Sequence, residues 1–162
     1  MNRRSSARAL RSTELYVVFA DNLYPNDNSV LALRAAPANV SVLAHPYHPA
    51  EANRRGVIVT TGADGRKLMA DLIEKPDLAH SLTLEQRHGT DNLWLLEGRA
   101  RLTAAFLRHL TALRLPAGTE PKLSLALRTY SRISPVVVVP TASEVIDLGM
   151  PTPHAITLGT QP

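Results

Sequence analysis

The sequence has no cysteine among its 162 residues. Disulfide bonds, thiolate metal sites and a cysteine nucleophile are therefore excluded. Aromatic residues make up only 4%, so a core must be built from aliphatic side chains, which the hydrophobic fraction of 44% supplies. This length is enough for one domain with a substantial buried core.

Long apolar runs are also missing. No stretch approaches the roughly 20 apolar residues that a membrane-spanning helix needs. The basic first residues are not followed by the apolar segment of a secretory signal. We therefore expect a cytoplasmic protein with no membrane partner.

Acidic residues and glycine are both missing from residues 1–13, which contain Arg3, Arg4, Arg8 and Arg11. These four arginines account for the whole formal net charge of +4, so the rest of the chain is balanced. We expect residues 1–13 to form a solvated basic arm. Nucleic-acid binding is the alternative, but it rests on this arm alone, and we do not expect it.

Runs of strand length alternate with stretches of helical spacing over residues 14–150. Strands are expected at 14–20, 39–44, 56–61, 67–73, 92–97 and 136–139, and helices at 30–36, 77–88, 102–113 and 122–132. This alternation predicts an α/β layered domain. Two runs around Gly62 and Gly65 predict a hairpin, which makes the sheet mixed. Residues 151–162 show no period and are expected to be an irregular tail.

The run at residues 14–20 is continuously apolar, which is typical of a strand buried on both faces of a parallel sheet. It ends in Asp21, and a second strand-like segment ends in Asp147. Ligands of α/β proteins bind beyond the carboxyl ends of strands, so the two aspartates are expected to meet at one rim of the sheet. Mg²⁺ prefers one or two carboxylates together with substrate phosphates. The pattern predicts a magnesium site over a nucleotide, with a loop cap as the alternative for each aspartate.

A second candidate is the segment Glu74-Lys75-Pro76, which directly follows the hairpin. A lysine at the end of a strand can direct its ammonium group at a phosphate. A plain surface charge is the alternative that the residues alone leave open.

Five short motifs follow one another in the chain in a recognisable order. They are VVFADN (17–22), RGVI (55–58), LIEKP (72–76), NL with GR (92–93 and 98–99) and IDLG (146–149). In this order the chain resembles the sugar-phosphate nucleotidyltransferases, which include the UTP–glucose-1-phosphate uridylyltransferases and the glucose-1-phosphate thymidylyltransferases. The resemblance spans about residues 15–149.

This resemblance implies a fold, a reaction and a cofactor. The fold would be the C-terminal portion of a Rossmann-like α/β/α sandwich with a mixed sheet. The reaction would transfer a nucleotidyl group from UTP or dTTP to a sugar 1-phosphate and release pyrophosphate, with Mg²⁺ as cofactor. By the same resemblance, the catalytic residues would be Lys75, Asp21 and Asp147, the metal ligands Asp21 and Asp147, and the substrate-binding residues Gly56, Glu74, Lys75, Asn92 and Gly98.

The chain departs from the family pattern in two ways. The glycine-rich loop that cradles the triphosphate has no counterpart, and the aromatic residue before Gly56 is replaced by Arg55. Enzymatic activity is therefore left open. The alternative is a catalytically incompetent remnant that binds a sugar nucleotide or a protein. A sheet that lacks strands exposes its edges, so we expect a homo-oligomer or a partner chain to cover them.

Overall fold

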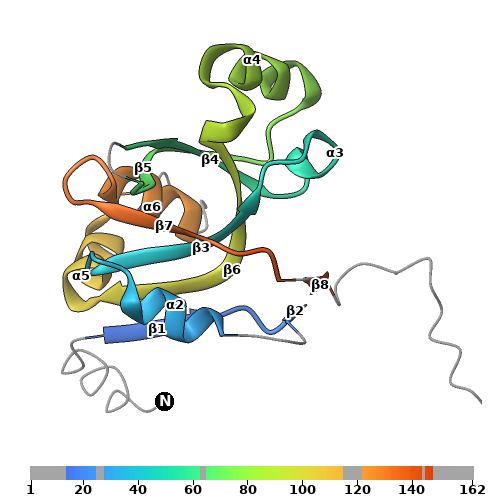
Figure 1. Cartoon of the computed structure of the whole chain (residues 1–162). Helices are drawn as coiled ribbons and strands as arrows, with labels where there is room; N and C mark the ends of the chain where they lie inside the picture. Colours follow the sequence, from blue (N-terminus) through green and yellow to red (C-terminus); the bar gives the residue numbers. More distant parts are fainter. Residues whose placement is uncertain (1–13, 25–27, 63–64, 115–121, 144, 148–162) are drawn as a thin grey trace, which may run out of the picture.

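A computed structural model of the chain describes residues 14–24, 28–62, 65–114, 122–143 and 145–147 (Figure 1). The strands are β1 Glu14–Val18, β2 Asn22–Leu23, β3 Val40–Pro46, β4 Gly56–Thr61, β5 Leu68–Glu74, β6 Leu93–Thr103, β7 Val136–Pro140 and β8 Ile146–Asp147. The helices are α2 Ser29–Ala35, α3 Pro49–Ala52, α4 Leu78–His88, α5 Ala104–Ala112 and α6 Leu123–Tyr130, with a 3₁₀ turn, η1, at Thr90–Asn92. Within these ranges no helix is long and apolar enough to cross a membrane.

The main sheet has the strand order β1-β6-β3-β7-β5-β4. Strands β3 and β7 run parallel, and the other pairs are antiparallel, so the sheet is mixed as expected. Strand β6 is long enough to pair with β4 near its start, with β1 near its end, and with β3 on its other side. A separate two-stranded ladder joins β2 to β8. The expected hairpin is confirmed as β4 and β5.

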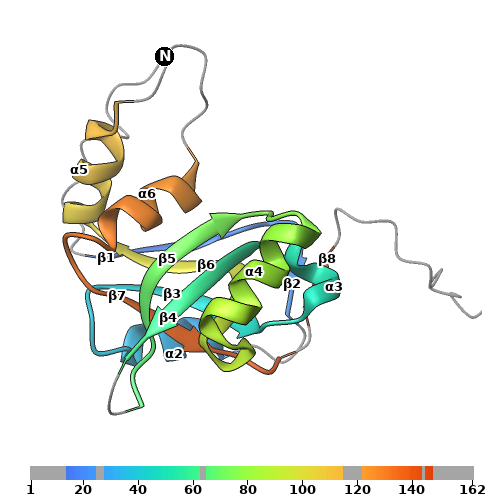
Figure 2. The ribbon, with the colours of Figure 1, turned by 90° about the horizontal axis from the view of Figure 1, so that it is seen from above.

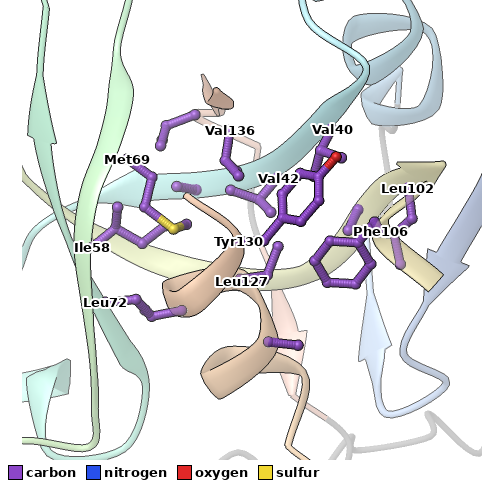
Figure 3. Packing of buried hydrophobic residues seen from close by; sticks show 14 of the residues in the cluster. Val40, Val42, Ile58, Met69, Leu72, Leu102, Phe106, Leu127, Tyr130 and Val136 are labelled. Atoms are coloured by element: carbon purple, nitrogen blue, oxygen red, sulfur yellow. The ribbon is translucent and has the colours of Figure 1, made fainter. Parts of the chain in front are cut away.

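Helices cover both faces of the main sheet, which gives the expected α/β/α sandwich (Figure 2). Val42 on β3 packs with Phe106 of α5 and Leu127 of α6 in the largest core cluster (Figure 3). The next residue of β3, Leu43, packs on the opposite face with Leu33 of α2. Successive side chains of a strand point to opposite faces, so β3 needs apolar residues at consecutive positions.

Strand β1 corrects one expectation from the sequence. It ends at Val18, pairs only with the antiparallel strand β6 among the described residues, and is not buried on both faces. Leu15 is 36% exposed and Val18 51% exposed. A continuous apolar run cannot by itself distinguish a central strand from an edge whose outer side is uncovered.

Strand β6 corrects a second expectation. It continues to Thr103, well past the expected end at residue 97, and α5 begins at Ala104 rather than at residue 102. The apolar run ends before Glu97, but the strand continues with Glu97, Arg99 and Arg101 buried. Arg101, for example, donates to the carbonyl groups of Arg34 and Ala36 at the end of α2, where the hydrogen bonds of a helix run out.

Candidate functional site

A cavity of about 520 Å³ opens beside the ends of several strands. Its wall comes from β1 and the β1–β2 connection, the start of β4, the residues after β5, the middle of β6 and the start of α6. The charged residues of the wall are Asp21, Glu74 and Glu97, and Arg54, Arg55, Lys75, Arg99 and Lys122. Five cationic residues face three carboxylates, so the cavity favours an anionic ligand.

The structure brings most of the residues named from the sequence to this cavity. Asp21, Gly56, Glu74, Lys75 and Gly98 all belong to its wall.

Asn92 and Asp147 are placed differently. Asn92 is exposed at the end of η1 and lies outside the cavity wall, and its Nδ2 donates to the carbonyl of His88 at 2.9 Å. The backbone of Asp147 lies opposite Asn22 in the ladder between β2 and β8. This ladder is separate from the main sheet, so the expectation that both aspartates share one rim of the main sheet is corrected.

The hairpin fixes one side of the cavity. Gly56 and Glu74 are partners in the register of β4 and β5, and the Lys75 N–H extends the ladder by donating to the Arg55 carbonyl at 3.1 Å. Lys75 has φ of 46°, the one positive value among the described non-glycine residues. A lysine in this left-handed region costs roughly 1 kcal/mol or more, and such strain is concentrated at functional sites.

A buried hydrogen-bonded network stands behind the hairpin. The Glu97 side chain is completely buried and accepts hydrogen bonds from the Tyr24 hydroxyl at 2.9 Å and from Arg55 Nη1. Nε of Arg55 lies 3.3 Å from Oε2 of Glu51. Arg99 places its guanidinium 3.9 Å from the centre of the Tyr24 ring.

Burial is the main influence on the two acidic groups of this network. It raises the pKa of Glu97, although the Arg55 charge and the Tyr24 hydrogen bond act in the opposite direction. The pKa of Tyr24 is also raised, first by burial and then by the Glu97 charge. Ionisation of Glu97 therefore carries a cost that the Arg55 charge only partly offsets.

Three other cations of the wall have no such partners. Arg54, Lys75 and Lys122 are exposed, and none lies within 4.0 Å of a carboxylate among the described residues. Lys122 immediately precedes α6, whose first residues, Leu123 and Ser124, also belong to the wall. These cations are available to an anionic group such as a phosphate.

Gly98 has a packing role that the sequence did not indicate. The N–H of Phe19 donates to the Gly98 carbonyl at 2.8 Å, which extends the β1–β6 ladder into the β1–β2 connection. A Cβ atom at residue 98 would lie 2.7 Å from Cβ of Phe19 and 2.8 Å from Nδ2 of Asn22. The close approach requires glycine here, whatever binds in the cavity.

The arrangement near Asp21 fits a magnesium ion. Asp21 is exposed and belongs to the cavity wall, and the backbone of Asp147 lies opposite the residue after it. The described residues contain no group of three or more side chains that could hold a metal. Mg²⁺ needs only one or two carboxylates when substrate phosphates and water complete its shell. The exposed carboxylate of Asp21 could therefore hold it together with a bound phosphate.

Sequence reasoning missed part of the cavity wall. It noted Arg55 only as a departure from the family pattern, and it did not single out Glu97. A usable signal was present, because Glu97 is a carboxylate directly after an apolar run within a strand. Such a residue is rarely buried without a charged partner, so a search for that partner leads to an arginine.

Comparisons with known families and with curated proteins find no match. Solved structures do match. A UDP-glucose pyrophosphorylase complexed with UDP-glucose is 20% identical with a TM-score of 0.69, over 90% of this chain and 55% of that one. A mannose-1-phosphate geranyltransferase from Thermus thermophilus is 22% identical with a TM-score of 0.62, over 90% and 49%. A UTP-bound UGPase from Acinetobacter baumannii is 14% identical with a TM-score of 0.63, over 89% and 49%.

These matches concern the fold. The chain spans about half the length of the solved structures that it matches, and identities of 14 to 22% support no finer assignment. The mixed sheet and the helices on both its faces agree with the architecture that the resemblance implied. The chain therefore has a sugar-phosphate nucleotidyltransferase-like fold, and the resemblance seen in the sequence is confirmed at that level.

Proposed function

We propose that this chain forms the sugar-phosphate half of a nucleotidyltransferase site and binds a sugar 1-phosphate, or the corresponding nucleotide sugar, in its 520 Å³ cavity. One observation carries the proposal: Arg54, Lys75 and Lys122, which lack carboxylate partners among the described residues, share the cavity wall with Glu74. A sugar phosphate needs this combination, because cations bind its phosphate and a carboxylate accepts hydrogen bonds from its hydroxyl groups.

Each residue then has a specific part. Lys75 binds the phosphate of the sugar 1-phosphate, and its constrained backbone limits the positions of its ammonium group. Glu74 accepts hydrogen bonds from sugar hydroxyls. Gly56 lets the sugar approach the backbone at the start of β4 closely, because it has no side chain.

The proposed reaction is nucleotidyl transfer. An oxygen of the sugar phosphate attacks the α-phosphorus of UTP or dTTP, the bond from that phosphorus to the bridging oxygen breaks, and pyrophosphate leaves. Lys75 offsets the negative charge that gathers on the phosphates in the transition state. Mg²⁺, when held by Asp21 and Asp147, would supply further charge neutralisation. No covalent intermediate with the protein is needed.

Glucose 1-phosphate and UTP are the substrates that we propose first, since the matched structures include proteins described with UDP-glucose and with UTP. The chain spans about half of those structures. A catalytically incompetent module that binds a sugar nucleotide or a protein is therefore the second candidate. The two candidates share the binding step and differ in turnover.

Calorimetric titration with glucose 1-phosphate and with UDP-glucose, with and without Mg²⁺, tests the binding step. Lys75→Ala should weaken binding about 10-fold or more, the usual loss for one hydrogen bond to a charged group. Asp147→Asn should remove the dependence on Mg²⁺. Arg128→Met is the control, since Arg128 is ion-paired to Asp71 and lies outside the cavity wall. A folded chain that binds neither ligand at millimolar concentration would contradict the proposal.

Pyrophosphate release from UTP and glucose 1-phosphate separates the two candidates. Turnover by this chain alone, lost in Lys75→Ala, would exclude the non-catalytic module. Ligand binding without turnover would instead favour that module.

A further inference from the structure

The cavity has two chemically different groups of cations. Arg54, Lys75 and Lys122 are exposed and have no carboxylate within 4.0 Å among the described residues. Arg55 lies in the same wall but contacts two carboxylates, Glu97 and Glu51. The phosphate of a ligand is therefore drawn to the first group, and Arg55 is left to contact another part of the ligand.

The two carboxylates determine what Arg55 can bind. An anionic group brought to Arg55 would also approach Glu97 and Glu51, and like charges at such short distances repel one another near a protein surface. Arg55 remains a good hydrogen-bond donor, however. A neutral oxygen atom can accept from it without this repulsion, and the hydroxyl groups of a sugar offer such atoms.

The same contacts hold Arg55 in place. Its Nε faces Glu51, its Nη1 is bonded to Glu97, and Glu97 is in turn fixed by the Tyr24 hydroxyl at 2.9 Å. A guanidinium carries five N–H groups in one plane, so the remaining N–H groups have a defined direction. Only 24% of the Arg55 side chain is exposed, so water replaces a missing ligand group poorly.

We propose that Arg55, held by Glu97 and Glu51, donates to a hydroxyl of the bound sugar and makes the site select a hydroxylated sugar 1-phosphate over its deoxy analogue. This inference rests on the function proposed above and adds the residue that sets its specificity. Arg55 contacts the substrate, whereas Glu97 is a positioning residue. Selection follows because a deoxy analogue leaves a partly buried donor without a partner.

The test measures the affinity of glucose 1-phosphate, of its single-position deoxy analogues and of inorganic phosphate. The wild type should bind at least one deoxy analogue about 10-fold more weakly than glucose 1-phosphate, the loss expected for one charge-assisted hydrogen bond. The double variant Arg55→Met/Glu97→Met removes the arginine without leaving its buried carboxylate unpaired. It should bind glucose 1-phosphate and that analogue equally, with unchanged affinity for inorganic phosphate.

Arg128→Met is the matched control, because Arg128 is also ion-paired, at 2.6 Å from Asp71, but lies outside the cavity wall. It should keep the full discrimination between the sugars. The same discrimination in the double variant, or none in the wild type, would overturn the assignment of Arg55. If the wild type bound neither glucose 1-phosphate nor phosphate, the proposed function itself would fail, and this inference with it.

Glu97→Gln provides a second test should the double variant not fold. It keeps an oxygen that accepts from Arg55 but removes one of the two carboxylates that repel anions. Inorganic phosphate should therefore bind several-fold more tightly to Glu97→Gln than to the wild type. Unchanged or weaker phosphate binding would contradict the proposed repulsion of anions at Arg55.

Discussion

The two sides of the cavity are built differently. The hairpin side, with Arg55, Gly56 and Lys75, is fixed by the β4–β5 ladder and by the buried Glu97. On the aspartate side, Asp21 lies beside the ladder of β2 and β8, which are two residues long each. A buried ion pair with a full ladder holds its side chains more firmly than a two-residue ladder does.

This difference bears on how the cavity would bind its ligand. The hairpin side is organised before the ligand arrives, so contacts there lose little conformational entropy on binding. Asp21 is exposed, and a metal with the ligand phosphates would have to fix its position. We therefore expect substitutions on the hairpin side to change stability as well as binding, and substitutions at the two aspartates to change mainly the Mg²⁺-dependent part of binding.

The largest expected effect is that of Glu97→Ala, which removes the support of the hairpin side. Arg55 would lose its buried partner, and the Tyr24 hydroxyl would lose its acceptor. Breaking a fully buried pair costs about 3–5 kcal/mol, and we expect about 2–3 kcal/mol here because Arg55 keeps Glu51 and part of its exposure. Urea unfolding measures this loss. A cost as small as that of Asp71→Ala, which breaks a part-buried pair outside the cavity wall, would contradict a special support of the hairpin side by Glu97.

Gly98→Ala tests the aspartate side. The added methyl group would meet Phe19 and Asn22 at less than 3 Å, so the β1–β2 connection must shift, and Asp21 with it. Overpacking costs roughly 1–3 kcal/mol, and an exposed connection that can move should bring this toward 1 kcal/mol. For stability alone, Gly56→Ala is the comparison, because its nearest neighbour is a flexible Leu72 side chain at 3.1 Å. We expect Gly98→Ala to weaken Mg²⁺-dependent binding, and unchanged binding would mean that Asp21 keeps its place when the connection shifts.

The pH dependence of stability should distinguish the hairpin side as well. Burial raises the pKa of Glu97 above its ordinary value of 4.5, so the folded chain holds this proton more tightly than the unfolded chain. The contribution of Glu97 is therefore fully present below 4.5 and is lost as the pH rises through the raised pKa. Each tenfold difference in proton affinity between the folded and unfolded chains corresponds to about 1.4 kcal/mol. Unfolding of the wild type and Glu97→Gln across pH 4 to 8 measures the loss, and a constant difference between them would contradict the raised pKa.

The sequence predicted best those elements whose signals lie in neighbouring residues. The hairpin around Gly62 and Gly65, for example, depends on neighbouring residues. The burial of Glu97 depends on Tyr24 and Arg55, which are far away in the chain. The position of Glu97 after an apolar run signals a buried partner, but no local pattern shows which residue that partner is, so the second half of β6 was missed.

The sequence likewise predicted some residues of the candidate site and not others. The order of the motifs led to Asp21, Gly56, Glu74, Lys75 and Gly98, which the structure places around one cavity. The same pattern also selected Asn92, whose side chain binds the end of α4 instead. Which residues of a motif reach a cavity depends on strand register and on turns, and these are set by the whole sheet.

Lys75→Gly separates the backbone strain at Lys75 from the contribution of its side chain to ligand binding. Glycine adopts φ of 46° freely, which relieves strain, although it also gains entropy in the unfolded chain. We expect a net gain in stability of about 0.5 kcal/mol together with a large loss of ligand affinity. Lys75→Ala should lose the same affinity without the gain, because alanine keeps the strain. Equal stabilities of the two variants would show that the Lys75 backbone is not strained.

The smallest effect on stability is expected at the exposed edge. Strand β1 borders the aspartate side and contains no lysine or proline that would prevent another strand from pairing with it. Val18 is 51% exposed and lies opposite Arg99, so Val18→Glu should change the free energy of unfolding by less than about 0.5 kcal/mol. The added charge should nevertheless oppose pairing between copies of the chain.

Sedimentation velocity over a range of concentrations measures this consequence. We expect the wild type to self-associate through β1 and Val18→Glu to do so less, whereas Leu78→Glu, at an exposed position on α4, should have no effect. If the wild type stayed monomeric throughout, β1 would be an edge that copies of the chain leave open. The aspartate side would then face solvent, and the weaker support of Asp21 compared with the hairpin side could not be made up by a second copy of the chain.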